Sequence, residues 1–387
     1  MKTKYLLILI LFTLPCKSQV KSFFEFDPRT LDKNEITLAE IADNITYIPL
    51  DNSIPLGMIY NYKFVNNSIY LSAKDIGILA FNRNGKILRK IGSIGRGPGE
   101  YTYYVYFTVD DKKETIYVLN SGNTIMEYSK TGKFLKSLSL SKYGGGIEAI
   151  ETYNSKLFAS FFLQLSGAKN EWIILDTLGN LIYNNERTIP PFSSGFGVTG
   201  GTYKLDNRMF YWNHYNDTVY SISGDLSKKP SFIISPGEFR LPRSNFNPFK
   251  QLSQYMQLQQ IFETSSFLVI RYFYKKMAIV LIDKKTRKSF VAYIESGAND
   301  NGDYSFGGII NNFDGGTMFL PKSYFVENDR EYMIGLINPY QIKAHTSNSE
   351  FRNSTPKYPD KKKEFEKLAT NLKETDNPVL MMVRLKR

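Results

Sequence analysis

The chain has 387 residues, of which 15% are aromatic and 22% are charged, and its formal net charge is +12. A single cysteine and two histidines exclude a fold held by disulfides, thiol catalysis, and a metal site built from histidine or cysteine ligands. Lys and Arg are scattered along the chain, so we interpret the positive charge as a contribution to solubility and predict no nucleic-acid partner. Abundant Tyr, Phe and Ile in short runs indicate an all-β protein.

Residues 1–18 have the pattern of a signal peptide. A short basic start is followed by an apolar run from Tyr5 to Leu14, well below the ~20 residues that span a bilayer. Cleavage after Ser18 would leave no cysteine in the exported chain. The alternative is a lipoprotein anchored through Cys16, although Pro15 fits poorly before a lipid-modified cysteine. We therefore predict a periplasmic or extracellular protein, with a membrane partner only if Cys16 is lipidated.

A repeated unit is the strongest signal of the fold. Residues 67–92 and 114–140 align on Ile69-Tyr70 and Ile116-Tyr117, and each contains three apolar runs separated by polar turns. Recurrence at this spacing, with several short strands per unit, is typical of a β-propeller.

Similar strands recur with decaying similarity further along the chain, at residues 157–158, 209–211, 267–269 and 318–320. We therefore predict six four-stranded antiparallel blades in one domain over residues 19–387. Strand-like segments at residues 45–50 and 379–385 are predicted to share the last blade, which would close the ring and hide its edges.

Two segments have a helical pattern. Only the first part of residues 249–262 is convincingly helical. Residues 360–373 place Phe365, Leu368 and Leu372 on one face, and Asp360 is a plausible N-cap. We expect this second helix to pack against the ring.

A glycine-rich string, residues 92–101, lies between the two clear repeats. It lacks the Gly-Lys-Ser/Thr of a phosphate loop, Pro98 removes a donor, and a strand rather than a helix follows. We interpret it as a connection between blades whose glycines adopt positive φ. Arg96, Glu100 and Tyr101 are candidate ligand-binding residues, because such connections line one mouth of a propeller.

A polar aromatic stretch contains Trp212, His214 and Tyr215. These side chains could form a stacking surface for a sugar or a peptide, and the alternative is a loop that caps the blade. The cluster at residues 299–303 suggests calcium at first, but the residue that should be Glu is Ile310, which favours a plain turn.

A catalytic role would need carboxylates in the central channel. Four acidic residues are candidates: Asp75, Glu127, Asp176 and Asp217. Strand and turn positions of any propeller contain such residues, so the sequence assigns no catalytic residue, metal ligand or cofactor.

The motifs resemble those of a known group. KIG-x-x-GRGPGEY at residues 90–101, together with YIPL at 47–50 and DNPVLMMVRLK at 376–386, resembles the six-bladed β-propellers with NHL-like repeats among exported Bacteroidota proteins. The resemblance implies the fold and export. We predict a monomeric, non-catalytic binding protein whose ligand, a glycan, peptide or partner protein, sits at one mouth. The alternative is a hydrolase or lyase that uses channel carboxylates, with or without Ca²⁺.

Overall fold

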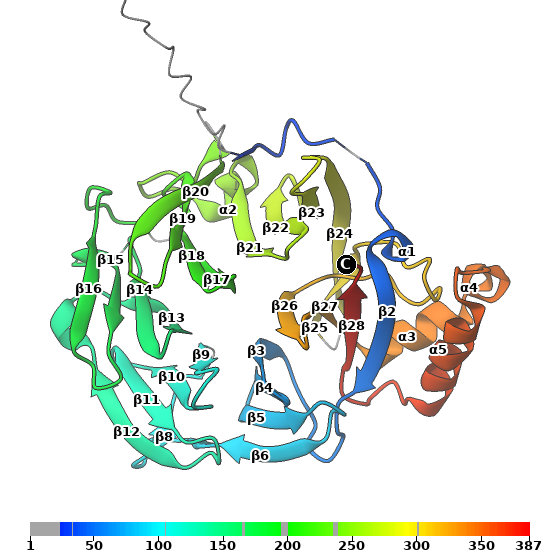
Figure 1. Cartoon of the computed structure of the whole chain (residues 1–387), viewed down its shortest axis with the longest axis horizontal. Coiled ribbons are helices and arrows are strands. Elements are labelled where there is room, and N and C mark those ends of the chain that lie inside the picture. Colours follow the sequence, from blue (N-terminus) through cyan, green and yellow to red (C-terminus); the bar gives the residue numbers. More distant parts are fainter. Residues whose placement is uncertain are drawn as a thin grey trace, which may run out of the picture.

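The computed structural model describes residues 24–32, 34–104, 106–164, 167–194, 200–234, 239–299 and 302–387. The predicted signal peptide and Cys16 lie outside these ranges, as does part of the turn at residues 299–303. Within the described ranges the protein is mostly β, and six sheets of four or five strands stand around a central opening (Figure 1). Each sheet is open and is not closed on itself.

The first three sheets follow one another along the chain, and each is an antiparallel meander. Sheet 1 contains β3 (Ile59–Val65), β4 (Ser68–Ala73), β5 (Gly77–Asn82) and β6 (Ile87–Ile91). Sheet 2 contains β9 (Phe107–Val109), β10 (Ile116–Asn120), β11 (Thr124–Tyr128) and β12 (Phe134–Ser139). Sheet 3 contains β13 (Ile147–Tyr153), β14 (Lys156–Phe161), β15 (Asn170–Leu175) and β16 (Leu181–Glu186).

The remaining sheets include strands from both ends of the chain. Sheet 4 contains β17 (Gly201–Leu205), β18 (Arg208–Trp212), β19 (Thr218–Ile222) and β20 (Lys228–Ile234), with β1 (Glu25–Phe26) added in parallel. Sheet 5 contains β21 (Gln257–Glu263), β22 (Phe267–Tyr274), β23 (Lys276–Asp283), β24 (Ser289–Asn299) and β25 (Gly302–Gly307). Sheet 6 contains β26 (Ser323–Glu327), β27 (Arg330–Ile337), β28 (Val379–Leu385) and β2 (Ala42–Pro49), in that spatial order.

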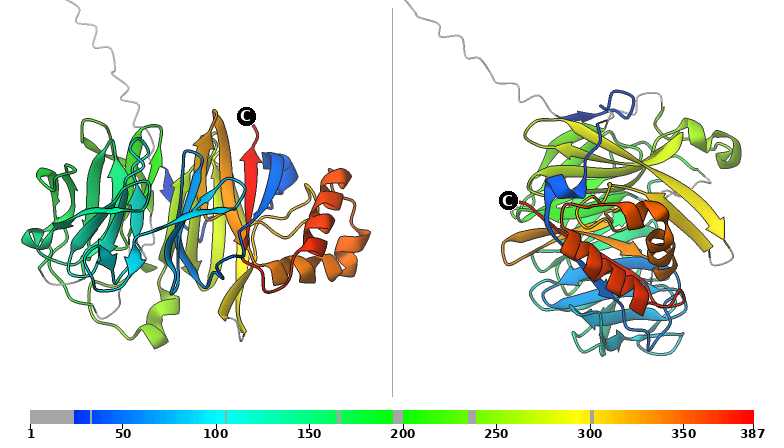
Figure 2. Two further views of the ribbon diagram at one scale, coloured as in Figure 1. Left: turned by 90° about the horizontal axis from the view of Figure 1, so that it is seen from below. Right: turned by 90° about the vertical axis from the view of Figure 1, so that its right-hand side faces the viewer.

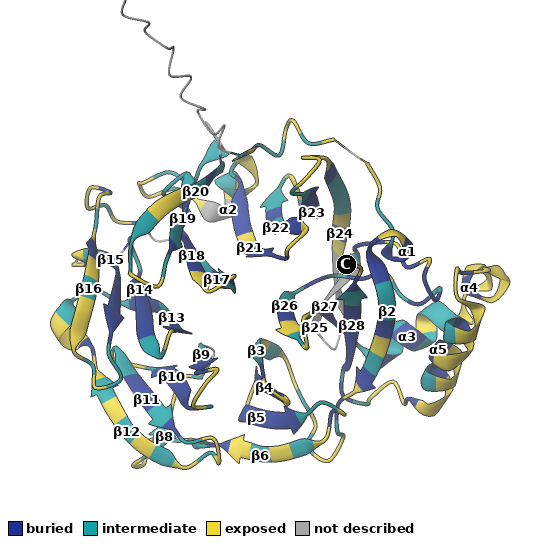
Figure 3. Ribbon diagram, in the orientation of Figure 1, coloured by how far each residue is buried: buried dark blue, intermediate teal, exposed yellow. Residues whose placement is uncertain are grey.

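Burial follows the position of each strand in its sheet. The middle strands β4 and β5 are buried on almost every residue, because both of their faces pack against neighbouring sheets. The outer strand β12 alternates between half-buried and exposed residues, as expected where one face meets solvent (Figure 3). The two predicted repeats correspond to β4–β6 and β10–β12. In both groups the three strands pair antiparallel in chain order.

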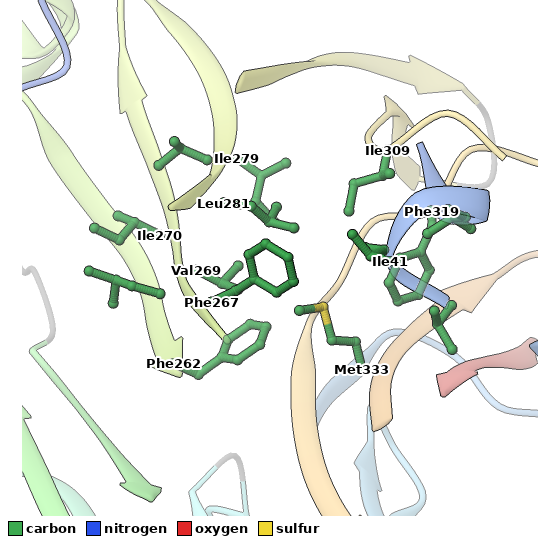
Figure 4. Close-up of a cluster of buried hydrophobic side chains, with 14 of the residues drawn as sticks. Ile41, Phe262, Phe267, Val269, Ile270, Ile279, Leu281, Ile309, Phe319 and Met333 are labelled. Carbon is green, nitrogen blue, oxygen red and sulfur yellow. The ribbon is translucent and has the colours of Figure 1, made fainter. Parts of the chain in front are cut away.

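The largest core cluster joins sheets 4, 5 and 6. In sheet 5, Phe262 and Phe267 point across the gap between sheets toward Met333 of β27 (Figure 4). Ile41, from the short helix α1 (Leu38–Ile41), fills the same space. Burial of these large apolar side chains is the main interaction that holds these neighbouring sheets together.

The two terminal segments meet as neighbours in sheet 6. Strand β2 pairs antiparallel with β28 from Ala42↔Leu385 to Pro49↔Val379, and β28 pairs on its other side with β27. A strand from the start of the described chain is therefore hydrogen-bonded to the last one.

The prediction of a blade strand at residues 318–320 was wrong. Phe319 makes only an isolated bridge to Ile309, and the corresponding strand of sheet 6 is β27. Residues 311–317, which contain Gly315 and Gly316, form turns and bends around the buried Asp314, so the chain there is not extended enough to pair.

Helices flank sheet 6 on the outside of the ring (Figure 2). They are α3 (Pro339–Ser347), α4 (Ser349–Asn353) and α5 (Pro359–Asn371). The predicted helix is α5, and its Phe365 packs against Tyr47 of β2 with ring centroids 4.8 Å apart. The N-cap is Tyr358, two residues before the predicted Asp360, because Pro359 occupies the first helical position where no N–H is needed. The other helical segment contains α2 (Pro248–Gln251) and a 3₁₀ turn at Leu252–Gln254, and β21 follows.

Candidate functional site

A cavity of about 1110 Å³ occupies the centre of the ring. It is lined by the innermost strand of every sheet, which are β3, β9, β13, β17, β21 and β26 (Figure 1). Each of these strands is paired on one side only, so its other edge and its polar side chains face the cavity. The cavity is thus a candidate binding site built by all six sheets.

A network of charges crosses this cavity. Glu151 of β13 accepts a salt bridge from Lys63 of β3 at 2.5 Å and lies 3.7 Å from Lys204 of β17. Lys204 also pairs with Asp111 at 3.1 Å, and the hydroxyl of Thr108 donates to Glu151. Burial alone would raise the pKa of Glu151, but Lys63 and Lys204 outweigh burial and lower it to about 2. Glu151 is therefore a fixed negative charge that ties sheets 1, 2 and 4 to its own sheet 3.

Removing one partner of this network should destabilise the fold. We expect Lys63→Met to lower the free energy of unfolding by about 1–3 kcal/mol, because Glu151 is buried and loses the nearer of its two lysine partners, which leaves Lys204 at 3.7 Å and the hydrogen bonds from Thr108 and from the backbone N–H of Thr152. Urea unfolding at pH 7 measures the change. Lys86→Met is the control, since its pair with Asp51 is 3.7 Å long and its side chain is exposed; there we expect less than about 0.5 kcal/mol. Equal changes in both variants would contradict the role assigned to the network.

Tyrosines gather where β3 begins. Tyr60, which lines the cavity and is 38% exposed, lies 6.1 Å from Tyr104, centroid to centroid. Tyr103 is 41% exposed. Partial burial raises the pKa of the Tyr103 hydroxyl, and the nearby Tyr60 raises it further. The hydroxyl of Tyr104 accepts from the backbone N–H of Asp75. The segment after the glycine string thus supplies partly exposed rings to one mouth of the cavity.

The glycine string itself is a connection, as predicted. It joins β6 to β9 and contains a short parallel pair, β7 (Ser93–Ile94) with β8 (Glu100–Tyr101). Gly92 and Gly99 have φ of 58° and 76°, and a Cβ on Gly92 would lie 2.6 Å from the ring of Tyr128. Only glycine allows both this backbone and this approach.

The three candidates in this string have different environments. Arg96 is exposed, whereas Glu100 accepts hydrogen bonds from the backbone N–H of Gly97 and the hydroxyl of Ser93 and so shapes the loop. Tyr101 is fully buried between sheets 1 and 2, and its hydroxyl donates to Ile91 O and accepts from Ile78 N–H. Burial raises the pKa of Tyr101 to about 12. Tyr101 therefore supports the fold and presents no surface to a ligand.

The second group of candidates is also largely buried. Trp212 lines the cavity but is 3% exposed, and it packs edge-on against His214. His214 Nε2 lies 2.8 Å from the carbonyl oxygen of Leu258, which links sheets 4 and 5. Tyr215 is buried against Phe192, and burial raises its pKa to about 12. Only Trp212 of these three lines the cavity.

The four acidic residues proposed for catalysis do not line this cavity. Glu127 pairs with Lys136 on an outer strand and Asp217 pairs with Arg240, while Asp176 caps the turn before β16 and Asp75 lies in the turn before β5. Within the described ranges, no three His, Cys, Asp or Glu side chains are grouped so that they could hold a metal ion.

The sequence pattern singled out none of Lys63, Glu151 and Lys204. The only available signal was a charged residue within an otherwise apolar strand, as Lys63 stands between Tyr62 and Phe64. Two further cations, Arg271 and Lys322, also line the cavity and were not predicted. None of the helices in the described part of the chain is long and apolar enough to cross a bilayer.

The fold defines a mostly β protein of propeller-like arrangement, with a polar cavity at its centre. The chain belongs to the family described as Domain of unknown function (DUF4934), whose model matches residues 23–384. No curated protein matches the chain.

One solved structure shows the same fold at low sequence identity, and others are similar to a lesser degree. A candidate exported protein of Bacteroides fragilis is 18% identical, with a TM-score of 0.67 over 94% of this chain and 99% of that one. A member of the duf4221 family from Bacteroides vulgatus is 10% identical, with a TM-score of 0.48 over 89% and 97%. Virginiamycin B lyase from Staphylococcus aureus is 11% identical, with a TM-score of 0.40 over 75% and 95%. The first likeness supports the fold alone, and no conclusion rests on the two weaker ones.

Proposed function

We propose that this protein is an exported, non-catalytic β-propeller of six blades that binds a glycan at one mouth of its central cavity. Each of the six sheets is taken as one blade, and the pairing of β2 with β28 supports closure of the ring by the two terminal segments. Residues 19–387 would form this single domain, with NHL-like repeats in sheets 1 and 2.

The observation that carries the proposal is the lining of the cavity. Partly exposed Tyr60 shares the lining of the cavity with amide and hydroxyl side chains such as Asn61, Gln259 and Thr202. Tyrosine rings can stack on the apolar C–H face of a sugar, while amides and hydroxyls can hydrogen-bond its hydroxyl groups.

The buried carboxylate of the cavity, Glu151, is better suited to binding and structure than to hydrolysis. A general acid needs a pKa near the working pH, whereas the pKa of Glu151 is lowered to about 2 by Lys63 and Lys204 against the effect of burial. Glu151 is also held by three neighbouring groups, so it is not free to act on a substrate.

Export rests on the N-terminal segment and on the likeness to an exported-type protein. Residues 1–18 have the basic start and apolar run of a signal peptide. The solved protein of Bacteroides fragilis that shares the fold is itself described as a candidate for export. Fractionation of cells that express the full chain, followed by N-terminal sequencing, would test cleavage after Ser18 against lipidation at Cys16.

A glycan and peptide array tests the proposed binding. We expect the wild-type protein to bind one class of glycan on the array. Tyr60→Ala should bind the same glycan with a two- to tenfold weaker affinity, about the loss expected for one ring contact. Tyr293→Ala is the matched control, because Tyr293 is 50% exposed but does not line the cavity. Binding to peptides alone, or equal affinity in both variants, would contradict a glycan site at this mouth.

A further inference from the structure

Two cations in the cavity lack acidic partners. Arg271, on β22, and Lys322, immediately before β26, both line the cavity. None of the ion pairs among the described residues includes either side chain. The Nε atom of Arg271 is buried and has no hydrogen-bond partner within the described part of the chain. Such a group is costly to leave unpaired and is rare in native proteins.

The other cations of the cavity are already compensated. Lys63 and Lys204 pair with Glu151 and Asp111, and Arg208 lies 4.0 Å from Asp206. The uncompensated positive charge is therefore confined to Arg271 and Lys322.

The two side chains influence one another. Burial lowers the pKa of Arg271, and burial together with the neighbouring Arg271 lowers the pKa of Lys322. Two like charges held together away from bulk water repel each other, and a bound anion would relieve that repulsion. Their backbones are fixed relative to each other, because the side-chain amide of Gln260, directly opposite Arg271 in sheet 5, donates to the carbonyl oxygen of Lys322.

The surroundings suit a ligand that carries an anion on a polar ring. Tyr62 lies close enough to Arg271 for the guanidinium to counteract part of the rise in pKa that burial gives to the Tyr62 hydroxyl. Tyr60 lies two residues earlier on the same strand, β3. An arginine fork can bind a carboxylate or sulfate through two parallel hydrogen bonds, and a lysine can add a point charge.

We propose that Arg271 and Lys322 form an anion subsite in the central cavity that binds a carboxylate or sulfate group of an acidic glycan. The subsite rests on the proposed glycan-binding function and narrows its ligand class. The ring of the same sugar lies toward Tyr60 and Tyr62, so that one mouth of the cavity recognises both the charge and the ring.

Calorimetric titration with three oligosaccharides of equal length tests this subsite. The probes are an oligogalacturonide, which carries carboxylates, a sulfated galactan oligosaccharide, and the neutral galactan oligosaccharide. We expect at least one acidic probe to bind about tenfold more tightly than the neutral one, a factor that corresponds to 1.4 kcal/mol. The tighter of the two acidic probes distinguishes carboxylate from sulfate recognition.

Charge-removing variants assign the effect to the subsite. Arg271→Met and Lys322→Met should each lose about tenfold or more in affinity for the acidic probe and bind the neutral probe as the wild type does. Arg271→Lys should recover part of the loss. Lys285→Met, in the exposed turn after β23, removes the same charge outside the cavity and should leave the affinity unchanged. Arg271→Met should unfold at the wild-type temperature or above it, because an uncompensated cation is removed.

The outcomes separate the two proposals. Equal affinity for acidic and neutral probes, with no effect of either variant, overturns the anion subsite and leaves the glycan site standing. A second outcome is that none of the three probes binds, while acidic peptides bind in a manner that depends on Arg271. This outcome overturns the glycan assignment and with it the subsite as stated. A third outcome is that Lys285→Met loses as much affinity for the acidic probe as Lys322→Met does. The effect would then come from the overall charge of the protein, which also overturns the subsite.

Discussion

Replacing Leu380 with alanine is expected to lower the free energy of unfolding by about 2–5 kcal/mol. Leu380 is 1% exposed, and it packs with Ile48 and Ile69 in the cluster between sheets 6 and 1. Its neighbours Val379 and Met381 point to the other side of β28 and belong to the cluster shared by sheets 4, 5 and 6. A cavity at Leu380 therefore weakens the strand on which two cores meet.

Leu135→Ala is the matched control for this prediction. Leu135 lies on the outer strand β12 and is 49% exposed, so the same deletion there should cost less than about 0.5 kcal/mol. Urea unfolding followed by circular dichroism gives both values. A loss at Leu380 no larger than at Leu135 would show that β28 is not needed to hold the ring.

Stability is expected to fall as the pH rises from 5 to 8, and Glu148→Gln should abolish most of that fall. Glu148 is 4% exposed and accepts from the backbone N–H of Gly200, and burial raises its pKa from 4.5 to about 8 in spite of this bond and one from Ser160. Between these two pH values the unfolded chain releases the proton while the native chain keeps it. The free energy of unfolding then decreases by about 1.4 kcal/mol per pH unit, up to about 5 kcal/mol in total.

Denaturant unfolding from pH 4 to pH 9 measures this slope. In the wild type, the contribution of Glu148 to the free energy of unfolding should be largest near pH 4–5 and should reach a lower plateau above pH 8. In Glu148→Gln the free energy of unfolding should depend little on pH. Glu366→Gln, at an exposed position on α5, should retain the wild-type slope. The same slope in Glu148→Gln as in the wild type would show that Glu148 is ionised in the native state.

The sequence predicted the sheets well because their signals are local. Each repeat carries its own apolar runs and its own turns, so β4–β6 and β10–β12 could be located from residues within one segment. Gly92 and Gly99 likewise indicate the connection between sheets, because a backbone with positive φ favours glycine over other residues.

The cavity could not be predicted in the same way because it is assembled from distant positions. Lys63 and Glu151 are 88 residues apart and meet only once sheets 1 and 3 are placed around the ring. Arg271 gives no local signal either, since a single arginine in a strand is usually solvated. At Tyr215 the local sequence suggested an accessible position that the fold does not provide. Its polar neighbours are typical of a surface loop, but Tyr215 is buried and packs against Phe192.

The pairing of β2 with β28 also has a consequence for the order of folding. The first long strand to leave the ribosome, β2, gains its hydrogen-bonded neighbour only after Leu385 has been synthesised. Closing so long a loop is slow, and until then β2 exposes an unpaired edge that is prone to aggregate. For a chain that is exported, as proposed here, this pairing means that β2 finds its partner only when nearly the whole chain is present on the same side of the membrane.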